Sequence, residues 1–369
     1  MGIRYRFQHP PESIAAVFAM PVTIYDIASK AGVSIATVSR VFNASKRVSA
    51  STRSNVLEVA ADLGYQPHAT ARSLARRRSS IVSAVIPMLT NYFFVEILRG
   101  LQDALAQTEY DLLVFSARTL DEVDGQMDRA LQRGQAAGVF VFSSPMTGER
   151  VAKLSRFQEA LVLVDCFHAG LDSVTTNNVE GGEVATRHLL EAGCDRIALI
   201  MANPDSVPAK DRKEGFERAL TSAGLSLDAS LVETSADSDH HGYNEQSGYD
   251  AMQKLLAGKV RPDGVVATSD VQAIGALRAI GEAGLSAPED VRVVGYDDIL
   301  IARHVGLTTI RQPMYEMGVM AAERLLSQMD VPTQTRAQTV LSPRLVVRGT
   351  TSIDVVSEEE SNEQVVGRA

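Results

Sequence analysis

The feature that most constrains the fold is an alternation, repeated along residues 81–352, of short β-branched runs with amphipathic segments of helical period. Strand followed by helix, many times over, is typical of parallel sheets with helices on both faces. The expected strands are Ile81–Ile86, Asp111–Phe115, Gly138–Phe142, Ala160–Val164, Arg196–Ile200, Gly264–Ala267 and Val291–Val294. The expected helices are Phe94–Gln107, Gly181–Ala192, Arg212–Ala223, Ser247–Leu256 and Val271–Ala283. Two such lobes fit this length, with ligands expected at the carboxyl ends of the strands.

Composition supports a large buried core and a cytoplasmic protein. Hydrophobic residues make up 45% of the 369 residues, and no apolar run reaches the ~18 residues needed to cross a membrane. The two cysteines, Cys166 and Cys194, have no metal-ligand spacing and are expected to be buried, reduced thiols.

Charge is distributed very unevenly along the chain. Residues 20–80 carry nine Lys and Arg against three Asp and Glu, a net charge of +6, and residues 1–19 add +1. Because the whole chain has a net charge of −9, the remainder carries −16. A basic end on an acidic body indicates a polyanion-binding head, with DNA contact confined to that head.

The basic segment has the pattern of a small three-helix unit. Residues 23–31 and 35–42 read as helices joined by a tight turn at Gly32-Val33, and a third helix runs from near Ser49 to Gly64. The expected inward residues are Ile24, Ile27, Ala28, Ala31, Val38, Val41, Val56, Val59, Ala60 and Leu63. Two short helices and a closing third form the helix-turn-helix plan, although a three-helix bundle without nucleic acid would show the same periodicity.

The outer face of the second helix has side chains suited to the DNA major groove. Arg40 can grip O6 and N7 of guanine together, whereas Ile35 and Ala36 can touch thymine methyl groups. Short side chains that suit phosphate oxygens are Ser34, Thr37, Ser39, Asn43, Ser49 and Thr52, and Arg47 is a further candidate DNA contact.

The stretch Val22–Arg78 closely resembles the headpiece and hinge of the lac repressor (LacI/GalR) family, almost residue by residue through DIASKAGVSIATVSRVFN. By this resemblance Ile35, Ala36 and Arg40 occupy base-reading positions. Residues 69–76 match a hinge helix that folds on DNA, with Leu74 as the apolar wedge in the minor groove. The resemblance implies a homodimer on a pseudo-palindromic double-stranded DNA operator.

The resemblance extends to about Thr351 and implies a fold and domain limits. We expect a small all-α helix-turn-helix headpiece and an α/β two-lobed core like that of periplasmic binding proteins, with parallel sheets. The expected segments are a disordered or wrongly assigned extension 1–21, the headpiece 22–67, the hinge and linker 68–80, the core 81–352 and a disordered acidic tail 353–369. The two lobes are expected at 81–178 plus 313–338 and at 179–312 plus 339–352.

The resemblance also implies an effector site between the lobes. Arg212 with Asp297 is the pair that would bind vicinal hydroxyls, and aromatic faces would stack on a sugar ring. The full expected set is Asn91, Phe93, Phe94, Ser143, Asp165, Arg212, Ser269, Asp297 and Gln312. Tyr92 and Ser269 depart from the family pattern of Pro and Asn. Each of these polar side chains could instead cap a helix or form a surface ion pair, and both phenylalanines could be core residues.

The sequence therefore predicts a repressor that binds DNA and a small effector, a sugar or sugar derivative, without a cofactor or metal. Control by a partner protein stays open, as does a solute-binding receptor, although that class would lack the basic head. An enzyme is not favoured, because the chain has neither a nucleophile elbow nor a phosphate loop. His240 and His241 lack a supporting ligand set, so a solvated loop is favoured over a metal site.

Overall fold

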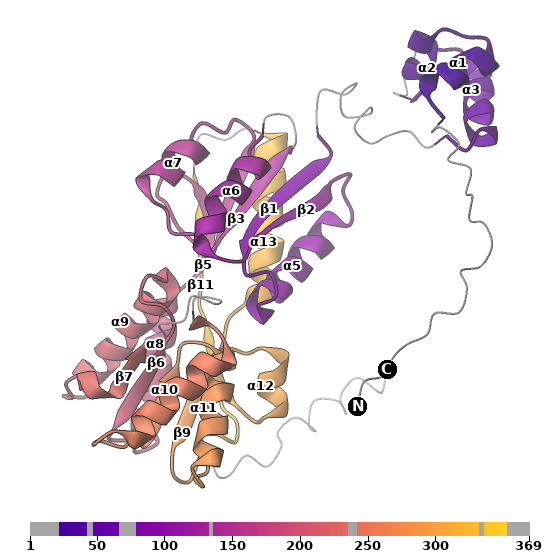
Figure 1. The fold of residues 1–369 in the computed structure, drawn as a ribbon. Helices are drawn as coiled ribbons and strands as arrows, with labels where there is room; N and C mark the ends of the chain where they lie inside the picture. The colour runs from indigo at the N-terminus through magenta and orange to yellow at the C-terminus, as the bar shows by residue number, and fades with distance from the viewer. Residues whose placement is uncertain are drawn as a thin grey trace, which may run out of the picture. The chain divides into compact units, whose positions relative to one another are not determined.

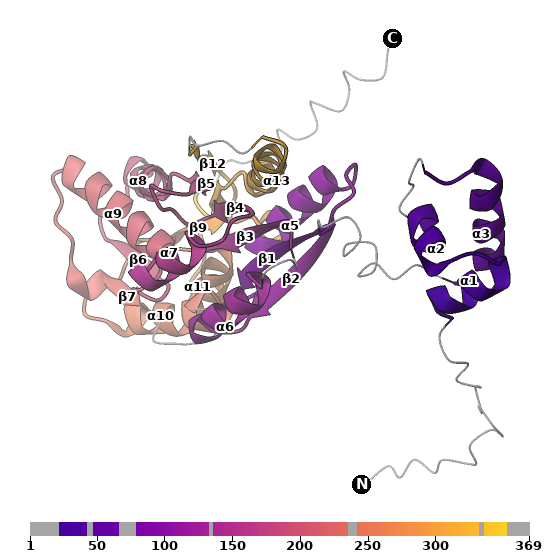
Figure 2. The same ribbon diagram turned by 90° about the horizontal axis from the view of Figure 1, so that it is seen from above.

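The computed structural model describes residues 22–42, 47–65, 79–132, 136–234, 242–331 and 336–352 (Figures 1 and 2). The chain divides into two compact units, Met1–Ser79 and Ser80–Ala369. The predicted extension 1–21, most of the hinge 68–80 and the tail 353–369 lie outside the described residues. So do His240 and His241.

The first unit contains three short helices, α1 (Ile24–Ala31), α2 (Ile35–Phe42) and α3 (Ala50–Asp62). The backbone N–H and hydroxyl of Thr23 donate to the Asp26 carboxylate at 2.8 and 2.7 Å, which fixes the start of α1. Gly32 ends α1 with φ of +65°, a conformation that a glycine adopts without strain. The tight turn predicted at this glycine is confirmed.

Each helix of the headpiece contributes to one small core. Ile27 from α1, Val38 from α2 and Val56 from α3 are completely buried. The rings of Phe42 and Tyr65 meet beside them at 5.5 Å between centroids. The inward faces predicted from helical periodicity are thus confirmed, and the opposite faces remain available to solvent.

The second unit is built on two six-stranded sheets, one in each lobe (Figure 1). The first has the order β11-β5-β4-β3-β1-β2 and is parallel throughout. Its strands are β1 (Ile81–Pro87), β2 (Asp111–Ala117), β3 (Gly138–Phe142), β4 (Ala160–Val164), β5 (Asp172–Thr176) and β11 (Gln338–Leu341). The second has the order β12-β10-β9-β8-β6-β7, in which only β12 is antiparallel. Its strands are β6 (Ile197–Met201), β7 (Val232–Thr234), β8 (Gly264–Ala267), β9 (Arg292–Asp297), β10 (Thr308–Arg311) and β12 (Arg344–Val346).

Helices cover both faces of each sheet, as the strand–helix alternation predicts. In the first lobe, α5 (Tyr92–Leu105) and α13 (Met314–Asp330) cover one face, with α6 (Leu120–Ala130) and α7 (Gly148–Leu154) on the other. In the second lobe, α8 (Asn178–Glu191) and α9 (Val207–Ser222) lie opposite α10 (Glu245–Ala257) and α11 (Asp270–Glu282). The short α12 (Leu300–His304) follows β9.

The chain passes between the lobes after β5, after β10 and after β11. The boundary predicted at 338/339 is wrong, because it cuts β11, whose residues 338–341 pair with β5 over Ser173–Thr176. The stretch Gln338–Leu341 has only two consecutive apolar residues, Val340 and Leu341, so its strand was not predicted from the sequence. The lobe limit lies near residue 342.

Some findings bear on what the chain can bind. No helix among the described residues is long and apolar enough to cross a membrane. In the same part of the chain no group of three His, Cys, Asp or Glu side chains could hold a metal ion. Cys194 is buried and Cys166 half-buried, and both are free thiols.

Candidate functional site

The α2 helix presents two different faces. Val38 and Val41 point into the headpiece core, whereas Ile35, Ala36 and Arg40 are exposed. The residues predicted to read bases therefore share the solvent-facing side of one helix. Such a face, with small and apolar side chains around a single guanidinium, can approach base edges in a major groove.

The residues predicted to contact phosphates gather at two helix starts. Ser34 accepts a hydrogen bond from the Thr37 backbone N–H at 3.2 Å, and Ser49 accepts one from the Thr52 N–H at 3.2 Å. The two hydroxyls of each pair also bond to one another, at 2.9 and 2.8 Å. Helix N-termini favour anions, so these positions suit phosphate oxygens.

Not every predicted DNA contact can be placed. Ser39 is half-buried and Arg47 is exposed, whereas Asn43 and Leu74 lie outside the described residues. One exposed residue was missed. Tyr25 in the first turn of α1 is 66% exposed, and its hydroxyl suits a phosphate. Its position off the apolar face of α1 is the signal that could have identified it.

In the core, a cavity of about 70 Å³ lies between the carboxyl ends of strands from both lobes. The first lobe lines it after β1, β3 and β4, and the second lobe lines it at the start of α9, before α10 and at the end of β9. This is where ligands bind in α/β sheets. The lining residues are Met88, Asn91, Phe93, Phe94, Ser143, Ser144, Pro145, Asp165, Cys166, Ser206, Val207, Pro208, Arg212, Tyr243 and Asp297.

The cavity is surrounded by strained backbone. Met88, Ser143, Asp165 and Asp297 have φ values of +54°, +39°, +55° and +120°. Each stands at or directly after the last residue of a strand. Asp298 is the only other non-glycine residue with positive φ among the described residues. Positive φ is unfavourable for these residue types, and such strain concentrates at functional sites.

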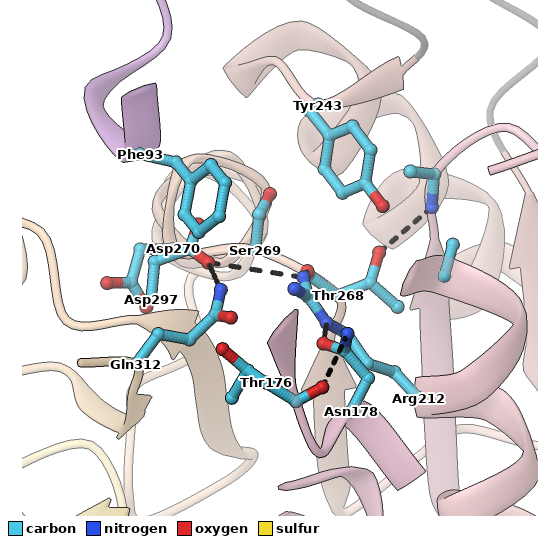
Figure 3. A network of polar contacts seen from close by, with 12 residues as sticks. Phe93, Thr176, Asn178, Arg212, Tyr243, Thr268, Ser269, Asp270, Asp297 and Gln312 are labelled. Carbon is cyan, nitrogen blue, oxygen red and sulfur yellow. Dashed lines mark hydrogen bonds and ion pairs between the residues drawn. The ribbon is translucent and has the colours of Figure 1, made fainter. Parts of the chain in front are cut away.

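Arg212 is the cation of the site and is held firmly (Figure 3). Its Nε donates to Asn178 Oδ1 at 2.9 Å and its Nη1 to the Thr268 carbonyl at 2.5 Å. The guanidinium lies over the Tyr296 ring at 3.7 Å from the centroid. Close helix packing places it, because a Cβ on Gly182 of α8 would lie 2.1 Å from the Arg212 carbonyl oxygen.

Asp297 lies beside Arg212, with its Oδ1 at 4.0 Å from Arg212 Nη1. The Gln312 side chain donates to the same oxygen at 2.7 Å (Figure 3). Burial raises the pKa of Asp297 to about 8, although the Arg212 charge opposes this shift. Burial therefore favours the protonated form of the Asp297 carboxyl, against the nearby Arg212 charge.

Asp165 is the acid from the first lobe. The Ser143 hydroxyl donates to its Oδ2 at 2.5 Å, and both residues have strained backbones. Burial raises the pKa of Asp165 to about 6, while the Ser143 hydrogen bond and the Arg212 charge lower it. The two lobes therefore each contribute a buried acid to one cavity.

Phe93 and Phe94 both line the cavity, and their rings meet edge to face at 5.2 Å between centroids. Phe94 also packs on Phe142, at 6.1 Å, so it is at once a core residue and a wall of the cavity. Asn91 lines the cavity while its side chain caps α5, accepting from the Phe93 N–H at 3.0 Å. All three residues therefore lie at the cavity wall, as predicted for the effector site, and their contact with a sugar stays a prediction.

Two predicted effector residues do not line the cavity. Ser269 is buried at the start of α11, where its hydroxyl accepts from the Gln272 N–H at 3.4 Å. Gln312 stands behind Asp297, and its Oε1 is buried without a partner among the described residues. Both act through neighbours: Ser269 shapes the helix start, and Gln312 orients the Asp297 carboxylate.

Sequence reasoning missed part of the second-lobe wall. The hydroxyls of Ser206 and Tyr243 bond to each other at 2.8 Å, joining the start of α9 to the segment before α10. The predicted helix began at Arg212, but α9 begins at Val207, with Pro208 in its first turn. The Ser-x-Pro pattern is a helix-start signal that could have identified Ser206. Nothing local points to Tyr243.

Comparisons with known proteins agree with both halves of this description. Residues 23–68 match the family model "Bacterial regulatory proteins, lacI family". Residues 186–351 match the "Periplasmic binding protein-like domain". Together these two matches cover the headpiece and most of the second lobe.

Relatives that align with most of the chain extend the match beyond these two segments. The chain is 32% identical over 337 residues to the HTH-type transcriptional regulator RegA of Clostridium saccharobutylicum, covering 90% of this chain and 100% of the relative. Among solved structures, a complex of the transcriptional regulator CelR with cellobiose is 30% identical, with a TM-score of 0.67 and coverage of 89% and 99%. The lac repressor dimer bound to operator and the anti-inducer ONPF is 27% identical, with a TM-score of 0.77 and coverage of 90% and 99%.

Proposed function

The chain belongs to the lacI family of bacterial regulatory proteins, and from that premise we propose that it is a cytoplasmic, homodimeric repressor controlled by a sugar-like effector. The headpiece would read double-stranded DNA and the cavity of the core would bind the effector. The strongest support is the cavity itself, where strained acids from both lobes meet a buried arginine.

The DNA-binding part of the proposal is supported by the exposed face of α2. Ile35, Ala36 and Arg40 face solvent there, while Val38 and Val41 hold the helix to its core. Two headpieces in a two-fold dimer require a two-fold operator. The lac repressor structure named above is a dimer on its operator, which favours the same assembly for this chain.

The effector part is supported by the pairing of polar and aromatic groups. Arg212 and Asp297 are spaced to bind neighbouring hydroxyls, and the faces of Phe93 and Tyr243 offer an apolar surface. The complex of CelR with cellobiose is a relative with a sugar bound. A ligand that binds both lobes would favour their closed arrangement. Because the ligand would bind the closed arrangement more tightly than the open one, it would change the affinity for DNA.

The test is a pair of binding measurements on the full chain. Duplexes would be selected from a random double-stranded library, and the affinity for the selected duplex then measured with and without each sugar of a panel. We expect a two-fold symmetric duplex to be selected and at least one sugar to change its affinity. If a duplex is selected but neither any sugar nor any nucleobase binds the protein, control by a partner protein replaces control by an effector.

A further inference from the structure

We propose that Asn178 and Gln312, two buried amides where the chain crosses between the lobes, are positioning residues that couple effector occupancy to the angle between the lobes. The inference rests on the proposed function, because it takes the cavity of the core as the effector site. A ring of contacts that runs from the first lobe through the cavity wall of the second lobe and back supports it.

The chain crosses between the lobes at three short segments, which we call the crossings. The first is Asn177, between β5 and α8, the second is residues 312–313, between β10 and α13, and the third is residues 342–343, between β11 and β12. A change in the angle between the lobes must alter the backbone at these few residues. A side chain at a crossing that also bonds to a cavity residue therefore connects the ligand site to that angle.

Asn178 spans the first crossing with its side-chain amide. It is the first residue of α8 and is 6% exposed. Its Nδ2 donates to the carbonyl oxygen of Thr176, the last residue of β5 in the first lobe, at 3.4 Å. Its Oδ1 accepts from Arg212 Nε at 2.9 Å in the wall of the cavity (Figure 3). One amide therefore joins the first lobe to the arginine that the effector would contact.

Gln312 makes the equivalent connection at the second crossing. Its Nε2 donates to Asp297 Oδ1 at 2.7 Å, and its backbone N–H donates to the Asp297 carbonyl at 3.3 Å. A carboxyl can accept the side-chain bond whether or not it is protonated. The Gln312 carbonyl accepts from the N–H of Met314, the first residue of α13 in the first lobe, at 2.9 Å. Gln312 therefore joins the first lobe to the acid that the second lobe contributes to the cavity.

The end of β9 holds the second crossing at a further point. Asp298, which directly follows Asp297, accepts from Arg311 Nε at 2.6 Å, and Arg311 is the last residue before this crossing. Asp297 and Asp298 have φ values of +120° and +61°. Such backbone is unfavourable for aspartate and persists only where the surrounding structure holds it. Two consecutive strained residues thus bond the cavity end of β9 to the crossing.

The two connections meet in each lobe and so form a ring. In the cavity wall, Arg212 Nη1 lies 4.0 Å from Asp297 Oδ1, the oxygen that Gln312 binds. In the first lobe, the Thr176 hydroxyl donates to the sulfur of Met317 in α13 at 3.3 Å. An effector that bonds to Arg212 or Asp297 would therefore contact the same ring of side chains that spans two of the crossings.

Gln312 is buried at a cost to stability. It is 2% exposed, and within the described residues its Oε1 receives no hydrogen bond. A buried acceptor without a donor lowers stability, so packing alone would favour an apolar side chain of the same length. The amide at this position is therefore better explained by its bond to Asp297 than by the stability of the crossing.

The third crossing bonds outside the cavity and provides a matched control. The hydroxyl of Ser342 donates to Glu180 Oε2 at 3.2 Å. Both residues lie outside the set that lines the cavity. Ser342→Ala therefore weakens a crossing without altering the cavity wall.

The test separates effector binding from its effect on DNA. Calorimetry on the full chain measures the binding of ribose, glucose, cellobiose, adenine and hypoxanthine. The affinity for the selected two-fold symmetric duplex is then measured without each compound that binds and with it at a saturating concentration. The ratio of these two affinities is the response. A residue that only shapes the site changes the concentration needed for saturation, whereas a coupling residue changes the response itself.

Two variants break the ring at different points. Gln312→Met keeps the length of the side chain and loses the bond to Asp297. Asn178→Asp keeps the acceptor for Arg212 and loses the donor to Thr176. We expect both variants to bind the compound with a response roughly fivefold smaller than that of the wild type, the equivalent of one hydrogen bond. Ser342→Ala should keep the wild-type response, and circular dichroism checks that each variant is folded.

The possible results distinguish the inference from the proposed function. A wild-type response in both folded variants overturns the inference and leaves the effector proposal intact, and so does a response lost only because the compound no longer binds. An equal loss of response in Ser342→Ala would show that weakening any crossing has this effect, which overturns the assignment to the two amides. If no compound binds the wild type and changes its affinity for the duplex, the inference fails together with the effector proposal.

Discussion

The headpiece and the core place their functional side chains in opposite environments. On α2 of the headpiece the residues proposed to read DNA, such as Arg40, face solvent over a small core of their own. In the core, Arg212, Asp165 and Asp297 are each less than a tenth exposed. DNA is a large partner that comes to a surface, whereas a small ligand must be surrounded before a few contacts can hold it.

Function and stability are coupled differently in these two environments. An exposed side chain is hydrated before binding, so its replacement changes affinity and leaves the fold intact. A buried charge is held by partners that lose their own hydrogen bonds when it is removed. We therefore expect substitutions in the cavity to alter folding and binding together, and substitutions on the exposed face of α2 to alter DNA binding alone.

The largest effect is expected from Arg212→Leu. It would leave Asp297 and the Asn178 and Thr268 oxygens without their partner, and so lower the stability of the core by about 3–5 kcal/mol. Arg218→Leu in the same helix is the control, because that side chain is 59% exposed and pairs with Glu214 at the surface. Urea unfolding followed by circular dichroism measures both. Equal stability of the two variants would break the distinction between buried and exposed groups.

The next effect concerns pH. Asp165 has a folded pKa of about 6, above the ordinary value of an unfolded Asp, so the folded state binds more protons between those values and its stability falls as pH rises. Asp165→Asn removes this loss, which is on the order of 3 kcal/mol. The unfolding free energy of the variant relative to the wild type should therefore rise between pH 4 and 7. Unfolding free energies measured across that range provide the check. A difference that does not vary with pH would show that Asp165 titrates normally.

Arg40→Ala should act only on DNA. We expect it to lose discrimination at one base pair, about 1–3 kcal/mol, with the unfolding free energy unchanged within ~0.5 kcal/mol. Competition binding with single-base variants of the selected duplex measures the first quantity. Arg47→Ala is the comparison, and it should weaken binding to all sequences alike. Uniform weakening by Arg40→Ala would place its guanidinium on phosphate.

The smallest effect is expected at a polar headpiece residue that has a structural role. Ser49 caps α3, so Ser49→Ala should cost the headpiece about 1 kcal/mol of stability. Ser29→Ala, on the exposed side of α1, should not destabilise it. Thermal unfolding of the headpiece transition measures both. If Ser49→Ala did not change the stability of the headpiece, the Ser49 hydroxyl would have no role in capping α3, and DNA contact would be its one proposed role.

Local signals made the headpiece predictable. The helix expected at 35–42 has those limits, and the one expected at 23–31 begins one residue later, because caps, turn and periodicity all lie within the segment itself. In the core, apolar runs such as Ala160–Val164 also revealed strands. Strand β5 was not predicted, because it opens with Asp172, a fully buried acid that Arg324 and Arg336 reach from distant segments.

The effector site likewise depends on contacts between segments that lie far apart in the sequence. Arg212 and Asp297 were identified through the family resemblance, and the fold brings them to one cavity. Ser269 occupies a motif position whose usual residue is Asn, and its hydroxyl turns inward to cap α11. Tyr243 joins the wall through a hydroxyl contact with Ser206, 37 residues away in sequence. Such contacts depend on how the helices pack, and this packing cannot be predicted from any local sequence pattern.

The most direct measurement is the preference of the full chain for one double-stranded sequence over a scrambled duplex of equal length, at low and moderate ionic strength. We expect tighter binding to a two-fold symmetric duplex, with the preference reduced by Arg40→Ala. Binding to both duplexes should weaken as salt increases. Equal affinity for every duplex at low ionic strength, with or without sugars, would contradict the assignment of α2 as a DNA-reading helix.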